Sequence, residues 1–137
     1  IYGVDEESLE LAALQVVTQA GWRLVVVESG TGGALTAALA GQAHDSFAGG
    51  EVLKEVQSPE AGQEALGRLQ ERTAAEVGLL LLLRETADRH EFDIFLRWPN
   101  DAQDWRRTYG GAPANAPEWA VSLTLDLLRR HMLIPRS

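Results

Sequence analysis

The sequence predicts an α/β domain, a three-layer α/β/α sandwich around a mixed, mainly parallel sheet. Short apolar runs typical of buried strands alternate with longer segments in which apolar residues recur at helical spacing. The connection between the last two predicted strands is too short for a crossover helix, so these strands are expected to be antiparallel. Residues 1–137 are expected to form one domain, because this length is enough for one normal core.

Four helices are expected, over residues 5–20, 34–40, 58–77 and 115–132. Asp5 is expected to cap the first helix, and Gly21 follows its end. Ser58 is expected to cap the third helix, with Pro59 in its first turn. Asn115 and Glu118 are spaced for reciprocal capping of the last helix.

Five strands are expected from runs of aliphatic, β-branched or aromatic residues. They cover Leu24–Val27, Phe47–Leu53, Leu79–Leu83, Phe92–Trp98 and Trp105–Tyr109. Leu24–Val27 and Leu79–Leu83 are apolar at every position. We therefore expect these two strands at the centre of the sheet, buried on both faces.

The segment Val25–Gly33, with the sequence VVVESGTGG, indicates a strand, a tight turn and the start of a helix. Glycines allow positive φ, and the first N–H groups of the helix lack intrahelical partners. Because these groups lie at the positive end of the helix dipole, the turn suits a small anion. The candidate ligand contacts in the turn are Glu28, Thr31, Gly32 and Gly33. The alternative is a structural turn, with Ser29 and Thr31 as helix caps.

The sequence of Glu28–Gly33, ESGTGG, resembles the ESCTGG signature of the CinA C-terminal domain family of competence/damage-inducible proteins. Downstream, Phe47–Gly50 is similar to the family's F-x-G-G. The likeness covers the first fifty residues and is faint beyond them. It implies a three-layer α/β/α domain with a mixed sheet, and it implies oligomers. Gly30 stands where the family usually has cysteine.

Active members of this family are nicotinamide-nucleotide amidases, so the resemblance makes Ser29 the candidate nucleophile. A serine needs an activating base, which in the family comes from the lysine and tyrosine of a YSNEAK segment. That segment is absent here in its usual form, and Lys54 is the candidate substitute. The family's TGIAGP loop is also absent, because residues 84–90 contain no glycine. Arg106 and Arg107 correspond to the family's arginine-containing last strand and are further candidate ligand contacts.

These departures favour a degenerate nicotinamide-nucleotide amidase without normal catalysis that binds a small anionic or nucleotide ligand at the glycine turn. The alternative is an active amidohydrolase that deamidates nicotinamide mononucleotide or a related amide, with Ser29 as nucleophile. Both interpretations keep the serine, so the sequence leaves the choice open. Neither interpretation involves a cofactor.

The composition narrows the class of partner. A net charge of -8 and a pI of about 4.8 disfavour nucleic acid and anionic membranes. There is no cysteine, and the spacings around His44 and His90 match no metal site, so no metal is expected. The lack of cysteine suits a cytoplasmic protein. Four tryptophans, several near the C-terminal third, suit the interface of a homo-oligomer.

Overall fold

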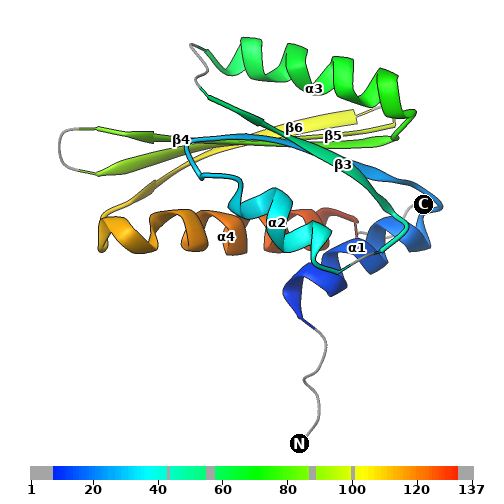
Figure 1. Cartoon of the computed structure of the whole chain (residues 1–137), viewed down its shortest axis with the longest axis horizontal. Helices are drawn as coiled ribbons and strands as arrows, with labels where there is room; N and C mark the ends of the chain where they lie inside the picture. The colour runs from blue at the N-terminus through cyan, green and yellow to red at the C-terminus, as the bar shows by residue number, and fades with distance from the viewer. Residues whose placement is uncertain (1–7, 43, 55–57, 87–88, 100, 133–137) are drawn as a thin grey trace, which may run out of the picture.

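The structure is a computed structural model, and it describes residues 8–42, 44–54, 58–86, 89–99 and 101–132. One five-stranded sheet separates two layers of helices (Figure 1). The strands are β2 (Leu24–Ser29), β3 (Phe47–Leu53), β4 (Val77–Glu85), β5 (His90–Trp98) and β6 (Asp101–Tyr109). All five predicted strands are therefore confirmed, and several extend beyond the predicted bounds.

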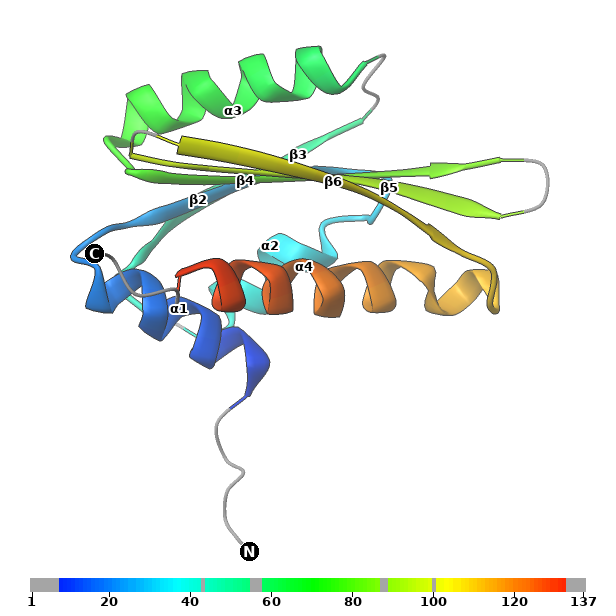
Figure 2. The ribbon, with the colours of Figure 1, turned by 180° about the vertical axis from the view of Figure 1, so that it is seen from behind.

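The strand order is β3-β2-β4-β5-β6. β2 pairs in parallel with β3 and β4, whereas β5 is antiparallel to both β4 and β6. Four of the five strands thus point the same way, which confirms the mixed sheet. Figure 2 shows that the β4–β5 hairpin extends well beyond α3, whereas α4 runs beneath it on the other face of the sheet.

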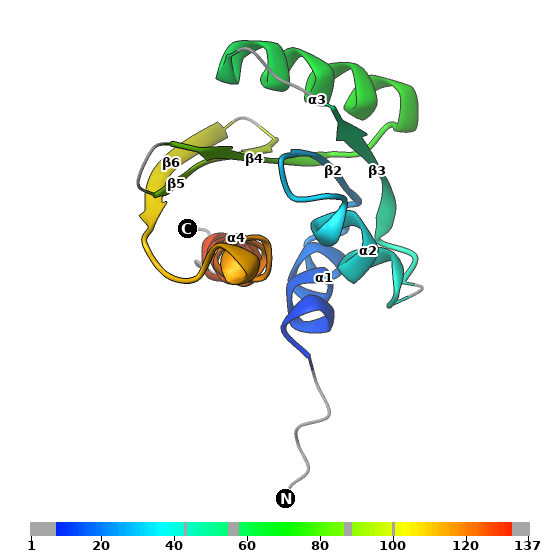
Figure 3. The same ribbon diagram turned by 60° about the vertical axis from the view of Figure 1, so that its left-hand side comes forward.

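The helices are α1 (Leu9–Gln19), α2 (Ala34–Ala40), α3 (Pro59–Thr73) and α4 (Ala116–Met132), with a 3₁₀ turn, η1, at Pro113–Asn115. Helix α3 covers one face of the sheet, and α1, α2 and α4 cover the other (Figure 3). This arrangement confirms the predicted three layers. Among the described residues, no helix is both long and apolar enough to span a bilayer.

Two predicted helix ends need comment. Ser8 caps α1, since its hydroxyl accepts a hydrogen bond from the Leu11 N–H at 3.1 Å, and Asp5 lies outside the described residues. The prediction that the third helix runs to about Val77 was wrong. Ala74 adopts a left-handed conformation with φ of 58°, which ends α3 at Thr73, and Val77 begins β4. Val77 fits both the helical spacing and the apolar run, so the pattern alone does not locate this boundary.

Side chains along β2 alternate between two cores. Leu24 and Val26 pack in the core beneath α1, α2 and α4, and Val25 and Val27 pack in the core beneath α3. All four are fully buried, which confirms the central position of this strand. The alternation continues into the polar end of the strand. Glu28 therefore faces the same side of the sheet as Leu24 and Val26, and Ser29 faces the same side as Val25 and Val27.

Candidate functional site

The Glu28 carboxylate caps helix α2. Its side chain is fully buried. One oxygen accepts a hydrogen bond from the Leu35 N–H at 3.0 Å, and the other accepts one from the Thr36 N–H at 2.6 Å. The Thr31 hydroxyl donates a further hydrogen bond to the first oxygen. A carboxylate at this point satisfies free N–H groups and complements the helix dipole.

Neither Ser29 nor Thr31 caps α2, contrary to the structural alternative considered from the sequence. Gly33 holds the N-cap position, which has no side-chain cap bond of its own. Thr31 instead donates its hydroxyl hydrogen to Glu28. Both Glu28 and Thr31 therefore have a structural role, and their contact with a ligand stays a prediction.

This cap leaves fewer N–H groups available to an anion than the sequence predicted. The Ala34 N–H donates to the Thr31 carbonyl at 3.2 Å. Gly32 and Gly33 have positive φ of 65° and 85°, and within the described part of the chain no hydrogen bond is recorded from their N–H groups. Anion binding at the turn stays a prediction that now rests on these two donors, close to a buried carboxylate.

Gly30 is required by the shape of the turn. Its φ is 84°, and a Cβ at this position would lie 2.1 Å from the carbonyl oxygen of Leu83 in β4. No side chain fits such an approach to a backbone atom. A cysteine at this position could not adopt the geometry of this turn, because its Cβ would meet the Leu83 carbonyl.

Ser29 lies at the end of β2, between Leu53 of β3 and Leu82 of β4. It is 7% exposed, and its hydroxyl makes no hydrogen bond to another described residue. Lys54 directly follows Leu53, so the candidate base lies at the same end of the sheet. Its side chain is exposed, and no hydrogen bond or ion pair joins it to Ser29. The described residues thus supply Ser29 with no activating base.

Arg106 and Arg107 are not brought to the glycine turn. Both lie on β6, and β4 and β5 separate this strand from β2. As consecutive strand residues they also face opposite sides of the sheet. Arg106 bonds to Asp93 at 2.8 Å, whereas Arg107 donates to the backbone carbonyl of Arg106 at 3.0 Å. The expectation that they join the turn in one binding site is not supported by this arrangement.

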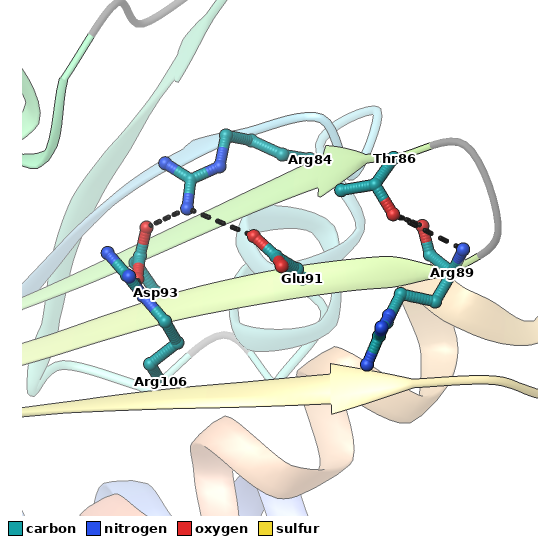
Figure 4. A network of polar contacts seen from close by, with 6 residues as sticks. All are labelled: Arg84, Thr86, Arg89, Glu91, Asp93 and Arg106. Carbon is teal, nitrogen blue, oxygen red and sulfur yellow. Dashed lines mark hydrogen bonds and ion pairs between the residues drawn. The ribbon is translucent and has the colours of Figure 1, made fainter.

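Arg106 instead belongs to a charged network on the α3 face of the sheet (Figure 4). Arg84 of β4 lies 2.7 Å from Asp93 and 3.7 Å from Glu91, both on β5. Asp93 therefore lies between two guanidinium groups, and its hydrogen bond and charge raise the pKa of Arg106. The sequence did not lead us to predict this network, although Glu91 and Asp93 are two residues apart and so share one face of a strand.

A cleft of about 510 Å³ lies next to the glycine turn. It is lined by Gly30, Leu83, Glu85, His90, Pro113, Ala114 and Pro117. Glu85 and His90 lie 3.9 Å apart across the β4–β5 hairpin, so the ionisable groups of the cleft are one acid and one imidazole. Among the described residues, the cleft included, no three potential metal ligands gather.

No protein-family model and no curated protein sequence matches the chain. Solved structures do match it. A competence damage-inducible protein A from Klebsiella pneumoniae subsp. pneumoniae MGH 78578 has a TM-score of 0.77 and 19% identity, covering 93% of this chain and 97% of that one. A CinA-superfamily protein from Klebsiella pneumoniae 700603 has a TM-score of 0.75 and 19% identity, with coverage of 90% and 95%.

A more distant match is the competence/damage-inducible protein CihA from Agrobacterium tumefaciens. Its TM-score is 0.64 at 16% identity, covering 93% of this chain and 96% of that one. Both chains are covered almost completely in all three comparisons, so the likeness extends over nearly the whole length of this chain. The fold implied by the ESGTGG resemblance is thereby confirmed.

Proposed function

Starting from the CinA-superfamily fold of this chain, we propose that it is a divergent CinA-like domain that has lost normal amidase catalysis. The observation that carries this proposal is the state of Ser29, which is nearly buried and has no base as a partner among the described residues. Without a base to accept its proton, a serine hydroxyl is a weak nucleophile.

Two further features of the turn support the loss of catalysis. Acyl transfer needs N–H donors aimed at the developing oxyanion. Here the Leu35 and Thr36 N–H groups are occupied by Glu28, and the Ala34 N–H by Thr31. The close approach of Gly30 to Leu83 gives the turn a shape that the family's cysteine cannot adopt.

We also propose that any retained ligand is small and anionic, and binds the N–H groups of Gly32 and Gly33. The buried Glu28 charge and the net charge of -8 oppose an anion here, so binding should be weak and should decrease with added salt. A cytoplasmic location belongs to the same proposal.

One observation favours the alternative of an active amidohydrolase. Leu53 pairs with Ser29, so Lys54 lies only one residue beyond a direct neighbour of the candidate nucleophile. Recruitment of the Lys54 amine as a base would need its side chain to turn toward Ser29.

The experiment that separates the two functions is ammonia release from nicotinamide mononucleotide by the whole chain and by its Ser29→Ala and Lys54→Ala variants. A non-catalytic domain releases only a trace, equal in all three proteins. An active enzyme loses its activity in the Ser29→Ala variant, and in the Lys54→Ala variant if the lysine is the base.

A further inference from the structure

Strand β6 forms one edge of the sheet and has an unpaired outer side within the described part of the chain. All nine of its residues, Asp101–Tyr109, pair with β5 without a shift of register. A long, regular edge strand presents a row of free N–H and C=O groups to a further strand. Figure 3 shows this edge at the outside of the molecule, at the side of the sheet opposite β3.

The two edges of the sheet differ in a way that matters for association. β3, at the other edge, has an extra residue at Ala48 and two glycines, Gly49 and Gly50, which make it irregular. Bulges, prolines and charged side chains, lysine above all, are the usual devices that keep an edge strand from pairing. β6 contains no proline and no lysine, and its pairing shows no bulge. Of the two edge strands, β6 is therefore the regular one, and its charges decide which strand can pair with it.

The charges of β6 change sign at Trp105. Two acids, Asp101 and Asp104, precede it, and two bases, Arg106 and Arg107, follow it. The strand thus carries no net charge, although the whole chain carries -8. Two copies of this strand that run antiparallel place the acidic half of one against the basic half of the other, and opposite charges that face each other stabilise a strand pair.

We propose that β6 joins two copies of this chain edge to edge, in antiparallel register centred on Trp105, to form one continuous sheet. This interface places Asp104 opposite Arg106 of the second copy, on the α3 face. Because the two copies are related by a two-fold axis, the contact between Asp104 and Arg106 occurs twice. The proposal concerns the assembly of the chain and does not rest on the proposed function.

The two charged side chains at the centre of this edge are exposed enough to make these contacts. The Arg106 side chain is 65% exposed while it bonds to Asp93, so it can bond to a second acid as well. Asp104 is exposed. On the α4 face, the half-buried Trp105 packs against His131, with ring centroids 4.8 Å apart, and is thereby held beside the two-fold axis.

The charges also favour this register, which is the one that pairs Asp104 with Arg106. A shift that brings Asp104 opposite Asp104 of the second copy sets two like charges against each other, which destabilises a strand pair. The Trp105-centred register instead places Gln103 opposite Arg107 and Asp101 opposite Tyr109 of the second copy. It therefore leaves no pair of like charges directly opposed along β6.

Sedimentation equilibrium of the whole chain tests the proposal. We expect the wild type at about 50 µM to sediment as a dimer of the 14.9 kDa chain. Asp104→Lys, which faces Arg106 of the second copy in this register, should raise the dimer Kd by about tenfold or more. Asp101→Lys makes the same change of charge on the same strand but faces a tyrosine, so it should change the Kd much less.

A second measurement tests the register through covalent cross-linking. The chain has no cysteine, so a single introduced thiol reports one position. Under mild oxidation, Trp105→Cys should yield a disulfide-linked dimer. Ala102→Cys should not, because it lies opposite Thr108 of the second copy and far from its own counterpart. A monomeric wild type, equal effects of the two lysine variants, or equal cross-linking at both positions would overturn the proposal.

Discussion

A hydrogen bond from the Leu35 N–H to the Glu28 carboxylate, 3.0 Å long, ties the end of β2 to the first turn of α2. The acid of the ESGTGG motif thus serves the helix that follows it. This contact determines what the rest of the turn can do, because a buried negative charge already occupies the positive end of α2.

The first prediction concerns the stability given by this cap. Glu28→Gln should lower the free energy of unfolding by about 2 kcal/mol, because neutral, weaker contacts replace the charge-assisted hydrogen bonds to buried N–H groups. Urea denaturation measures the change. Glu60→Gln is the matched control, since Glu60 is an exposed acid in the first turn of α3 and should change stability by less than about 0.5 kcal/mol. Equal losses in both variants would contradict the assigned role of Glu28.

The second prediction concerns the replaced residue of the motif. Gly30→Ala should lower the free energy of unfolding by about 3 kcal/mol or prevent folding, since it adds both a positive-φ cost and a clash with Leu83. Gly32→Ala separates these causes, because Gly32 has φ of 65° but open space around it. This variant should lower the free energy of unfolding by only about 1 kcal/mol. Thermal and urea denaturation of both variants provide the comparison, and a milder effect at Gly30 than at Gly32 would refute it.

The third prediction concerns the charged network of Figure 4. Asp93→Asn should lower the free energy of unfolding by about 2 kcal/mol, because it leaves the guanidinium groups of Arg84 and Arg106 facing each other without an intervening charge. Asp45→Asn removes an exposed acid in a loop and should be nearly neutral. Urea denaturation at low and high salt tests the pair. If Asp93→Asn does not lower the free energy of unfolding more than Asp45→Asn does, the network does not stabilise the sheet.

The fourth prediction concerns anion binding at the turn. Titration with inorganic phosphate should move the backbone amide signals of Gly32 and Gly33 in NMR spectra, and leave those of Leu35 and Thr36 nearly fixed, because Glu28 occupies the latter. Removal of the negative charge in Glu28→Gln should strengthen the effect, and added sodium chloride should weaken it. If the two glycine amides do not move while other sites do, the turn is only an element of the fold.

Much of the fold could be predicted from local patterns. The apolar runs at Leu24–Val27 and Leu79–Leu83 required burial on both faces, and the structure places both at the centre of the sheet. Ser58 and Pro59 marked the start of α3 correctly. The end of α3 was missed, because the left-handed conformation of Ala74 leaves no signature in a residue that is a good helix former.

The site was harder to predict than the fold, because its contacts depend on side-chain direction. Glu28 was expected to face a ligand, and its alternation with Ser29 along β2 decides instead that it faces α2. Arg106 and Arg107 were treated as one pair, although neighbours on a strand face opposite sides of a sheet. The pairing of Arg106 with Asp93 depends on the strand order, which local sequence does not specify.

The central claim is that Ser29 no longer acts as a nucleophile. Its most direct test is ammonia release from nicotinamide mononucleotide, measured for the wild type beside the Ser29→Ala variant, with folding of both verified by circular dichroism. We expect at most a trace, unchanged by the substitution. Turnover on the order of 1–10 per second, the range of ordinary enzymes, that disappears in the Ser29→Ala variant would contradict the claim.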